Sequence, residues 1–128
     1  MSATTAAAMV SAARDSIENL SVDQVKAELE QGTPLLIDIR ESEELAATGW
    51  IAGTIHAPRG MLEFYADPAS PYHRAELSPN ARGILYCASS GRSALAVKAL
   101  RQLGYTQAAH LDGGIKAWSA AGQPLERL

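Results

Sequence analysis

Hydrophobic residues recur at helical spacing in two segments of the chain. Residues 22–31 place three apolar side chains on one helical face, with Ser21 and Gln24 in the pattern of a capping box and Gly32 at the stop. A second helix is predicted over residues 93–103, directly before the glycine stop in "QLGY". Its expected inward positions are Leu95, Ala96, Ala99, Leu100 and Leu103.

Short apolar runs bounded by turn residues predict three buried strands, over residues 35–39, 82–87 and 107–111. A shorter edge strand is expected around residues 54–56. The proline-rich segment over residues 66–80 is expected to be a long surface loop, because proline lacks the N–H that the interior of a strand or helix requires.

Further helical segments lie between and around these strands. Residues 41–48 predict a short acidic helix closed by Gly49, residues 58–66 a helical turn or two, and residues 113–121 a short helix. Residues 6–19 predict a loose helix or frayed arm, because alanine favours helix while the apolar face is thin. Strands that alternate with helices indicate an α/β fold with a parallel sheet, whose ligands bind beyond the carboxyl ends of the strands.

Length and charge limit the classes of protein to consider. With 128 residues and 47% hydrophobic content, the chain suits one globular domain. We expect residues 20–128 to form that domain and residues 1–19 to be an N-terminal helix or flexible arm. The formal net charge of -3 and the scattered lysines and arginines argue against nucleic acid or an anionic membrane as a partner.

Cysteine usage points to a reducing compartment. The chain has one cysteine, and its histidines are not at metal-ligand spacing, so we expect no internal disulfide, no metal and no cofactor. The alanine-rich start lacks the basic residues of a secretory signal, and no apolar run approaches the ~18 residues of a membrane span. A cytoplasmic location is the simplest expectation.

The stretch "YCASSGRS" carries the candidate chemistry. Cys87 ends a predicted strand, and four small residues separate it from Arg92 at the start of a predicted helix. These four are Ala88, Ser89, Ser90 and Gly91. Residues of this size let successive backbone N–H groups turn inward around an anion, and the positive end of the helix adds to the same field. The arrangement favours the thiolate of Cys87, a nucleophile, over the thiol.

Plainer interpretations exist for both ends of this loop. Cys87 could be a small hydrophobic residue buried at the end of a core strand, as free cysteines often are. Arg92 could bind oxyanion oxygens through its planar fork and organise the loop, or be a solvated residue of the first helical turn. The small residues and the helix start that follow Cys87 favour a functional thiol.

Four ordered motifs resemble those of the single-domain rhodaneses, a sulfurtransferase family, over nearly all of the chain. "LLIDIRESEEL" is similar to the family's opening strand and acidic helix, with Asp38, Arg40, Glu43 and Glu44, and "GWIAGTIHAPRG" to the turn that follows. "YCASSGRSALAVKALRQLGY" resembles the family's active loop, and "AAHLDGGIKAWSAAGQPLE" its closing signature. Trp50 stands where the family usually has histidine, so any role of that histidine is not carried over.

The resemblance implies a rhodanese-like three-layer fold, with a central parallel sheet and helices on both faces. It also implies that Cys87 takes a sulfane sulfur from a donor such as thiosulfate, holds it as a persulfide and passes it to cyanide or a thiol. Residues 88–92 would cradle the persulfide, with Ser93 continuing into the helix. Phosphatase relatives of this architecture place five residues between cysteine and arginine, whereas this chain has four, which favours sulfur over phosphate.

Other residues have candidate supporting roles. Arg59 is either a rim for an anionic donor or a plain surface residue. Asp38 is expected to support the site by capping loop N–H groups or pairing with an arginine, and Arg40 to be its counter-charge or a solvent-facing residue. We expect the histidines to be satisfied polar side chains rather than bases, and the tryptophans to be core or rim aromatics.

The expected partners are a small anionic sulfur donor and a thiol or cyanide acceptor. A second class of function stays open. The same loaded Cys87 could serve a module that carries sulfur to an acceptor protein, or that senses persulfide or redox state, with poor turnover of small acceptors. The complete loop favours the enzyme, since an inactive relative would be expected to lose the cysteine.

Overall fold

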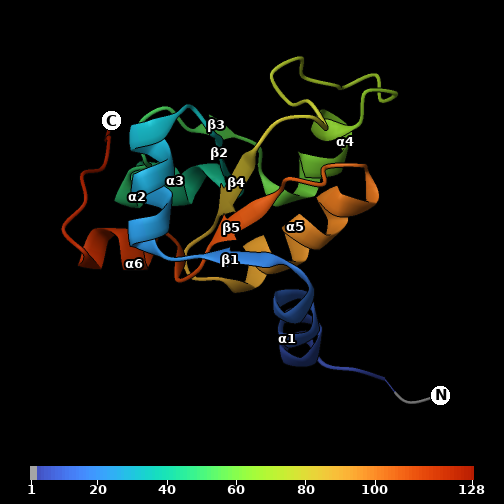
Figure 1. The fold of residues 1–128 in the computed structure, drawn as a ribbon, viewed down its shortest axis with the longest axis horizontal. Helices are drawn as coiled ribbons and strands as arrows, with labels where there is room; N and C mark the ends of the chain where they lie inside the picture. The colour runs from blue at the N-terminus through green and yellow to red at the C-terminus, as the bar shows by residue number, and fades with distance from the viewer. Residues whose placement is uncertain (1–2) are drawn as a thin grey trace.

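The computed structural model describes residues 3–128, which fold around one five-stranded parallel sheet in the order β1-β5-β4-β2-β3 (Figure 1). The strands are β1 Glu18–Leu20, β2 Leu35–Asp38, β3 Ile55–His56, β4 Gly83–Tyr86 and β5 Ala109–Leu111. The helices are α1 Ala6–Ser16, α2 Val22–Gln31, α3 Ser42–Thr48, α4 Leu62–Ala66, α5 Gly91–Gln102 and α6 Gly114–Ala120, with a 3-10 turn, η1, at Arg59–Met61. The predicted α/β class with a parallel sheet is confirmed.

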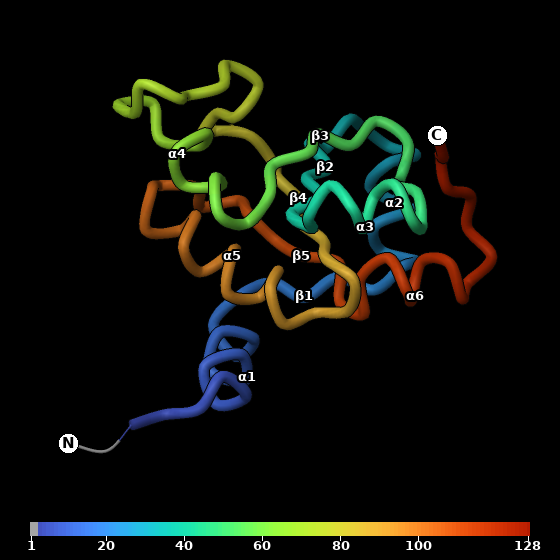
Figure 2. Tube along the Cα trace, turned by 180° about the vertical axis from the view of Figure 1, so that it is seen from behind, coloured from blue at the N-terminus to red at the C-terminus, as the bar shows by residue number. Residues whose placement is uncertain are grey.

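Helices cover both faces of the sheet and make three layers. The α4 and α5 helices lie on one side and α2, α3 and α6 on the other, a division visible from the front and from behind (Figure 1 and Figure 2). Each face of the sheet has its own hydrophobic core, and successive strand residues point to alternate faces. Ile37 and Leu85 belong to one core, and Leu36 and Ile84 belong to the other. This alternation on both buried faces explains why the strands read as continuous apolar runs.

The inward face of α5 differs in part from the expected one. The buried positions are Ser93, Ala94, Ala96, Val97 and Leu100. Leu95 and Ala99, which we expected to face the sheet, are half-buried and line a hollow together with residues of α1. The reason is that α1 packs against α5 and gives it a second apolar contact, so helical periodicity alone did not identify the sheet-facing side.

The edge strand β1 was not predicted from the sequence. Its three residues include one buried side chain, Leu20, which is too little to show a strand pattern. The strand pairs with β5 in a register that sets Asn19 opposite His110. The segment after α1 is therefore held in the sheet beside the strand that leads toward α6.

Candidate active site

Cys87 follows β4 directly and begins the loop that leads into α5. The neighbouring strand β2 ends in register, with Asp38 opposite Tyr86, so the carboxyl ends of the two strands meet at the same edge of the sheet. The residue is buried, with 1% of its surface exposed, and packs with the core on the α5 side. The thiol therefore lies at the bottom of the loop.

The backbone of the loop offers a row of hydrogen-bond donors. The N–H groups of residues 88–92 donate no hydrogen bond to any residue in the described range 3–128. The helical ladder begins only afterwards, where the N–H of Ala94 donates to the carbonyl of Ser90 at 2.9 Å. Residues 88–92 are half-buried or, at Ser89, exposed, so these donors are within reach of solvent or a ligand. Free N–H groups at a helix start are suited to binding an anion.

The loop backbone lies directly against a pair of glycines. Gly114 has a φ of +63°, and a Cβ atom there would fall 2.5 Å from the carbonyl oxygens of both Cys87 and Ser89. Its neighbour Gly113 also has a positive φ, of +87°. Both positions require glycine, since residues with a Cβ atom rarely adopt a positive φ. Gly114 also has no room for a side chain.

This close approach lets the first turn of α6 hold the loop carbonyls. The N–H of Ile115 donates to the carbonyl of Cys87 at 2.9 Å, and the N–H of Lys116 to that of Ala88 at 3.1 Å. In a trans peptide the C=O and the following N–H point in opposite directions. The N–H groups of Ala88 and Ser89 therefore point away from α6, which leaves them available to a ligand.

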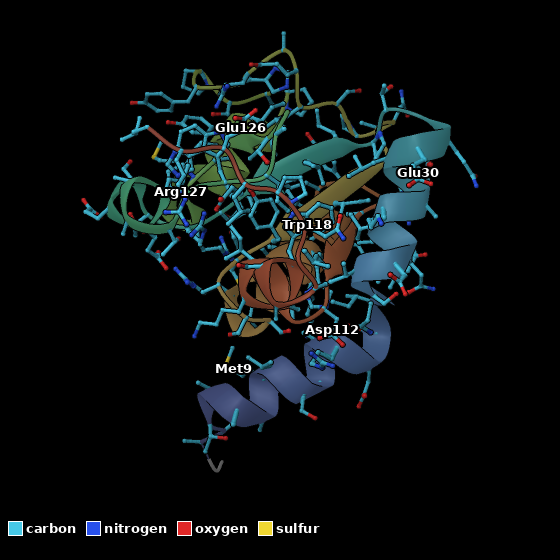
Figure 3. The ribbon with its side chains drawn as sticks, turned by 90° about the vertical axis from the view of Figure 1, so that its left-hand side faces the viewer. Met9, Glu30, Asp112, Trp118, Glu126 and Arg127 are labelled. Atoms are coloured by element: carbon cyan, nitrogen blue, oxygen red, sulfur yellow. The ribbon has the colours of Figure 1, made fainter. Side chains whose placement is uncertain are left out.

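A carboxylate fastens the N-terminal helix to the loop. Asp112 accepts a hydrogen bond from the Ser90 hydroxyl at 2.8 Å, and that hydroxyl accepts the N–H of Gly113 at 2.8 Å. Arg14 of α1 donates two hydrogen bonds to the same carboxylate, of 2.6 and 2.9 Å. Figure 3 shows Asp112 beside α1. The hydrogen bonds from Arg14 lower the pKa of Asp112 and favour its ionised form.

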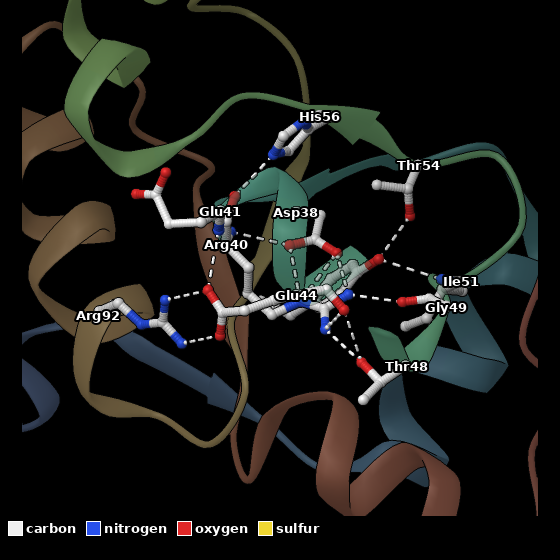
Figure 4. A network of polar contacts seen from close by, with 11 residues as sticks. Asp38, Arg40, Glu41, Glu44, Thr48, Gly49, Ile51, Thr54, His56 and Arg92 are labelled. Carbon is white, nitrogen blue, oxygen red and sulfur yellow. Dashed lines mark hydrogen bonds and ion pairs between the residues drawn. The ribbon is translucent and has the colours of Figure 1, made fainter. Parts of the chain in front are cut away.

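The guanidinium of Arg92 is paired with Glu44 of α3. Its two terminal nitrogens lie 2.8 and 2.9 Å from the two carboxylate oxygens, the fork arrangement shown in Figure 4. One of these oxygens also accepts the N–H of Glu41 at 2.9 Å. The hydrogen bonds from Arg92 hold the pKa of Glu44 down, at about 2. A substrate anion that used this fork would have to displace a carboxylate.

Asp38 and Arg40 form a buried ion pair behind Glu44. Their closest N–O distance is 2.7 Å, and neither side chain is more than 2% exposed. The Arg40 guanidinium also donates to the carbonyl of Gly49 at 2.7 Å and to the hydroxyl of Thr48 at 2.8 Å (Figure 4). The solvent-facing alternative for Arg40 is therefore wrong. The pair fixes the C-terminal end of α3, the helix that presents Glu44 to the loop.

Arg59 lines a different cavity from the one that reaches the cysteine loop. It belongs to η1 and pairs with Glu63 one turn later, at 2.7 Å. It lines a hollow of about 490 Å³ between α1 and α5, whose lining includes none of residues 87–93. The structure does not bring Arg59 into the same hollow as the cysteine loop.

A larger cavity, of about 670 Å³, does reach the loop, through Ala88. It lies between α3 and α6 and is also lined by Lys116 and Arg127. Figure 3 shows Arg127 on the C-terminal segment that runs beyond α6. Sequence reasoning missed both cations, because nothing in their local sequence distinguishes them from ordinary surface residues.

Three side chains connect Cys87 to β1. The sulfur of Cys87 lies 3.5 Å from the Ser93 hydroxyl, which lies 2.7 Å from Nδ1 of His110. Nε2 of His110 lies 2.6 Å from Oδ1 of Asn19. Burial lowers the pKa of His110, and Asp112 opposes that effect. Both ring nitrogens therefore have polar partners, and the link from His110 through Ser93 to the thiol was not anticipated.

Two further features bear on the class of protein. Over residues 3–128, no group of three or more His, Cys, Asp or Glu side chains is placed to hold a metal ion. None of the helices in that range is long and apolar enough to cross a membrane.

Comparison with curated proteins places the chain among known sequences. The model of the "Rhodanese-like domain" family matches residues 21–121. The "Probable adenylyltransferase/sulfurtransferase MoeZ" of Mycobacterium tuberculosis is 34% identical over 97 residues, which are 75% of this chain and 23% of that protein. YrkF of Bacillus subtilis, provisionally named a sulfur carrier protein, is 27% identical over 105 residues, which are 81% of this chain and 52% of that protein. The chain spans about half or less of the length of these relatives.

Solved structures share the fold. A protein of unknown function from Rhodopseudomonas palustris, described as a possible tyrosine phosphatase, aligns with a TM-score of 0.92 and 37% identity over 98% of this chain and 97% of that one. A thiosulfate sulfurtransferase from Pseudomonas aeruginosa aligns with a TM-score of 0.74 and 29% identity over 93% of this chain and 22% of that one. These matches confirm the resemblance carried by the four sequence motifs. The chain belongs to the family of rhodanese-like domains.

Proposed function

We propose that this protein is a sulfurtransferase that carries a sulfane sulfur on Cys87. The thiolate attacks the outer sulfur of an anionic donor such as thiosulfate, the S–S bond of the donor breaks, and sulfite leaves with the bonding electron pair. A thiol or cyanide then attacks the outer sulfur of the persulfide, and the Cys87 thiolate is restored. The observation that carries the proposal is the row of unpaired N–H donors that follows Cys87.

These donors suit the charges of the proposed reaction. The thiolate, the ionised persulfide and the departing sulfite are all anions, and backbone donors already held in place stabilise such charge without reorganising. Ala88, Ser89, Ser90 and Gly91 are small enough to leave room for a second sulfur atom. In our proposal the Arg92 guanidinium releases the Glu44 carboxylate and binds the oxyanion of the donor in its place.

The relatives support this chemistry at the level of sulfur transfer. MoeZ carries sulfurtransferase in its name, and the Pseudomonas aeruginosa neighbour is a thiosulfate sulfurtransferase. We extend from these to a small anionic donor and a thiol or cyanide acceptor for this chain. A lone reactive thiol persists in a reducing environment, so we also propose a cytoplasmic location.

A second candidate function is sulfur delivery to an acceptor protein. Cys87 is almost wholly buried, which limits its encounters with small acceptors in solution. The relative YrkF is provisionally named a sulfur carrier. A carrier would accept sulfur on Cys87 as the enzyme does, but would release it slowly to cyanide or small thiols.

Phosphate-ester hydrolysis is the alternative suggested by the Rhodopseudomonas palustris neighbour. Here the loop has four residues between Cys87 and Arg92, one fewer than the phosphatase pattern. We therefore expect no hydrolysis of an aryl phosphate under conditions in which sulfur is transferred.

Intact-mass spectrometry after incubation with thiosulfate tests the proposal. We expect a gain of ~32 Da, as one sulfur retained on a reactive thiolate would give, and no gain in the Cys87→Ser variant. Loading of that variant, or no loading of the wild type, would contradict the proposal. Addition of cyanide then separates the candidates, because rapid ping-pong turnover indicates the enzyme and a persistent adduct the carrier.

A further inference from the structure

A continuous row of polar side chains runs from the active thiol to the edge of the sheet. Its members come from four places: Cys87 after β4, Ser93 in α5, His110 in β5 and Asn19 in β1. The successive contacts are 3.5, 2.7 and 2.6 Å. Cys87, Ser93 and His110 are each at most 1% exposed, so the contacts between them are shielded from bulk water.

The hydrogen bonds of Asn19 fix the direction of the row. Its amide nitrogen lies 2.9 Å from the carbonyl of Arg14 and 3.2 Å from that of Ile17, and only an N–H can satisfy both. The amide oxygen is therefore the atom that faces His110, at 2.6 Å, and it must accept a hydrogen bond from Nε2–H. Nδ1 of a neutral His110 is then left as an acceptor.

The remaining hydrogens follow from that tautomer. The hydroxyl of Ser93 has one hydrogen and two acceptors in reach, the carbonyl of Ser90 at 3.1 Å and Nδ1 of His110 at 2.7 Å. The shorter contact is the one to the imidazole. With its hydrogen directed there, the Ser93 oxygen presents a lone pair to the thiol hydrogen of Cys87.

We propose that His110 receives the thiol proton of Cys87 through the Ser93 hydroxyl. The S–H bond of Cys87 breaks as its proton bonds to the Ser93 oxygen, and the former hydroxyl hydrogen of Ser93 bonds to Nδ1 of His110. The products are a thiolate that accepts a hydrogen bond from Ser93 and an imidazolium that still donates from Nε2 to Asn19. No atom or electron is gained or lost, and the return of the proton restores the thiol.

The surroundings of His110 suit a neutral proton acceptor. The charged groups nearby are Asp112, directly beyond β5, and Arg14 of α1, which pair with each other. Asp112 raises the pKa of His110 and Arg14 lowers it, while burial, the largest effect, lowers it further. Ser93 from α5 and Asn19 from β1 are uncharged, and Cys87 is the proton donor itself. The imidazole of His110 is thus neutral near pH 7. After the proton transfer, the positive charge of its imidazolium is compensated by the negative charge of the Cys87 thiolate.

As a proton acceptor, His110 has a different role from the one expected from the sequence, and this role rests on the proposed nucleophilic role of Cys87. The sequence favoured a satisfied structural histidine, and both ring nitrogens are indeed satisfied. The direction of the row adds a route for one proton. His110 acts through Ser93 and does not touch the sulfur, so it is a positioning residue whose effect depends on pH.

Alkylation of Cys87 by iodoacetamide over a range of pH tests the relay, because this reagent consumes thiolate and needs no sulfur donor. The variants are Ser93→Ala, His110→Asn and the double variant, with thermal unfolding to show that each is folded. Near neutral pH we expect each single variant to react about a hundredfold more slowly than the wild type, the scale of one lost acid–base step. The double variant should be no slower than either single one.

The pH dependence separates a relay from a structural role. At high pH, hydroxide can remove the thiol proton directly, so the alkylation rates of the variants should approach that of the wild type. An equal deficit at every pH, additive losses in the double variant, or wild-type rates in the single variants would each overturn the proposal. If alkylation behaves as expected while thiosulfate leaves no sulfur on the protein, the proposed function fails and the relay stands.

Asn19→Asp provides a test in the opposite direction. A carboxylate that accepts the Nε2–H of His110 favours the imidazolium and hence the thiolate. We expect this variant to keep a faster alkylation rate than the wild type as the pH is lowered below neutral. An unchanged profile in a folded variant would contradict the coupling of His110 to Cys87.

Discussion

Arg92 and Glu44 lie in a two-point ion pair, with N–O distances of 2.8 and 2.9 Å, that joins the end of the cysteine loop to α3. Glu44 also lines the cavity that reaches Ala88. A carboxylate in that position repels an anionic donor and competes with it for the guanidinium. The pair therefore holds the loop in shape at some cost in donor affinity.

Replacement of Glu44 by Gln should strengthen donor binding. Removing the competing charge frees the Arg92 fork, and since a partly exposed pair is worth up to ~1 kcal/mol, we expect half-maximal sulfur loading at about fivefold less thiosulfate. Loading rates measured against thiosulfate concentration check this. Glu43→Gln is the matched control, since Glu43 is exposed in the same helical turn. Slower loading in Glu44→Gln alone would show instead that Glu44 is needed to position Arg92.

Acidification should abolish the contribution of the Arg92–Glu44 pair to the unfolding free energy within a defined pH range. The pKa of Glu44 is lowered from 4.5 to about 2, first of all by the hydrogen bonds from Arg92. A carboxyl group with a lowered pKa in the folded state adds stability above its unfolded pKa, and that stability is lost as the pH falls through the folded value. The difference in unfolding free energy between wild type and Glu44→Gln should therefore shrink between pH 4.5 and about 2. A difference that stays constant across this window would show that Glu44 does not titrate as part of the pair.

Gly114→Ala should disrupt the loop far more than a comparable glycine change. Both Gly114 and Gly122 have positive φ values, but only at Gly114 does a Cβ meet the loop carbonyls, at 2.5 Å. We expect Gly122→Ala to lose about 1 kcal/mol of unfolding free energy from backbone strain, and Gly114→Ala at least ~2 kcal/mol more from the clash. Urea unfolding checks the difference, and only Gly114→Ala should also lose sulfur loading. Equal losses would mean that the close approach to the loop is not required.

The N-terminal helix should influence the active loop through Arg14. Loss of its contact with Asp112 releases the carboxylate that holds Ser90, so we expect Arg14→Ala to load sulfur about fivefold more slowly, on the scale of one partly exposed ion pair. Arg101→Ala is the control, because Arg101 joins α5 to the end of α1 through the Ser16 carbonyl without touching the loop. Loading rates of both variants at saturating thiosulfate decide the matter. Equal rates in the two variants would show that α1 only covers α5.

The features that the sequence by itself determined are those made by residues close together along the chain. The capping box of α2 is present, with both Ser21 and Gln24 bonds formed, because its partners are three residues apart. The apolar runs became buried parallel strands, since each run contains enough residues to show its own pattern. The loop from Cys87 to Arg92 could likewise be singled out as a candidate anion site, because five consecutive residues supply its free N–H donors.

The tertiary structure alone decided how that loop is held and what faces the thiol. Arg92 meets Glu44 over 48 residues, Ser93 meets His110 over 17, and Arg14 meets Asp112 over 98. No spacing rule links such partners, because their proximity results from strand order and from the packing of α1 on α5. The strand β1 was missed for the same reason: its three residues are held by their register with β5 rather than by a pattern of their own.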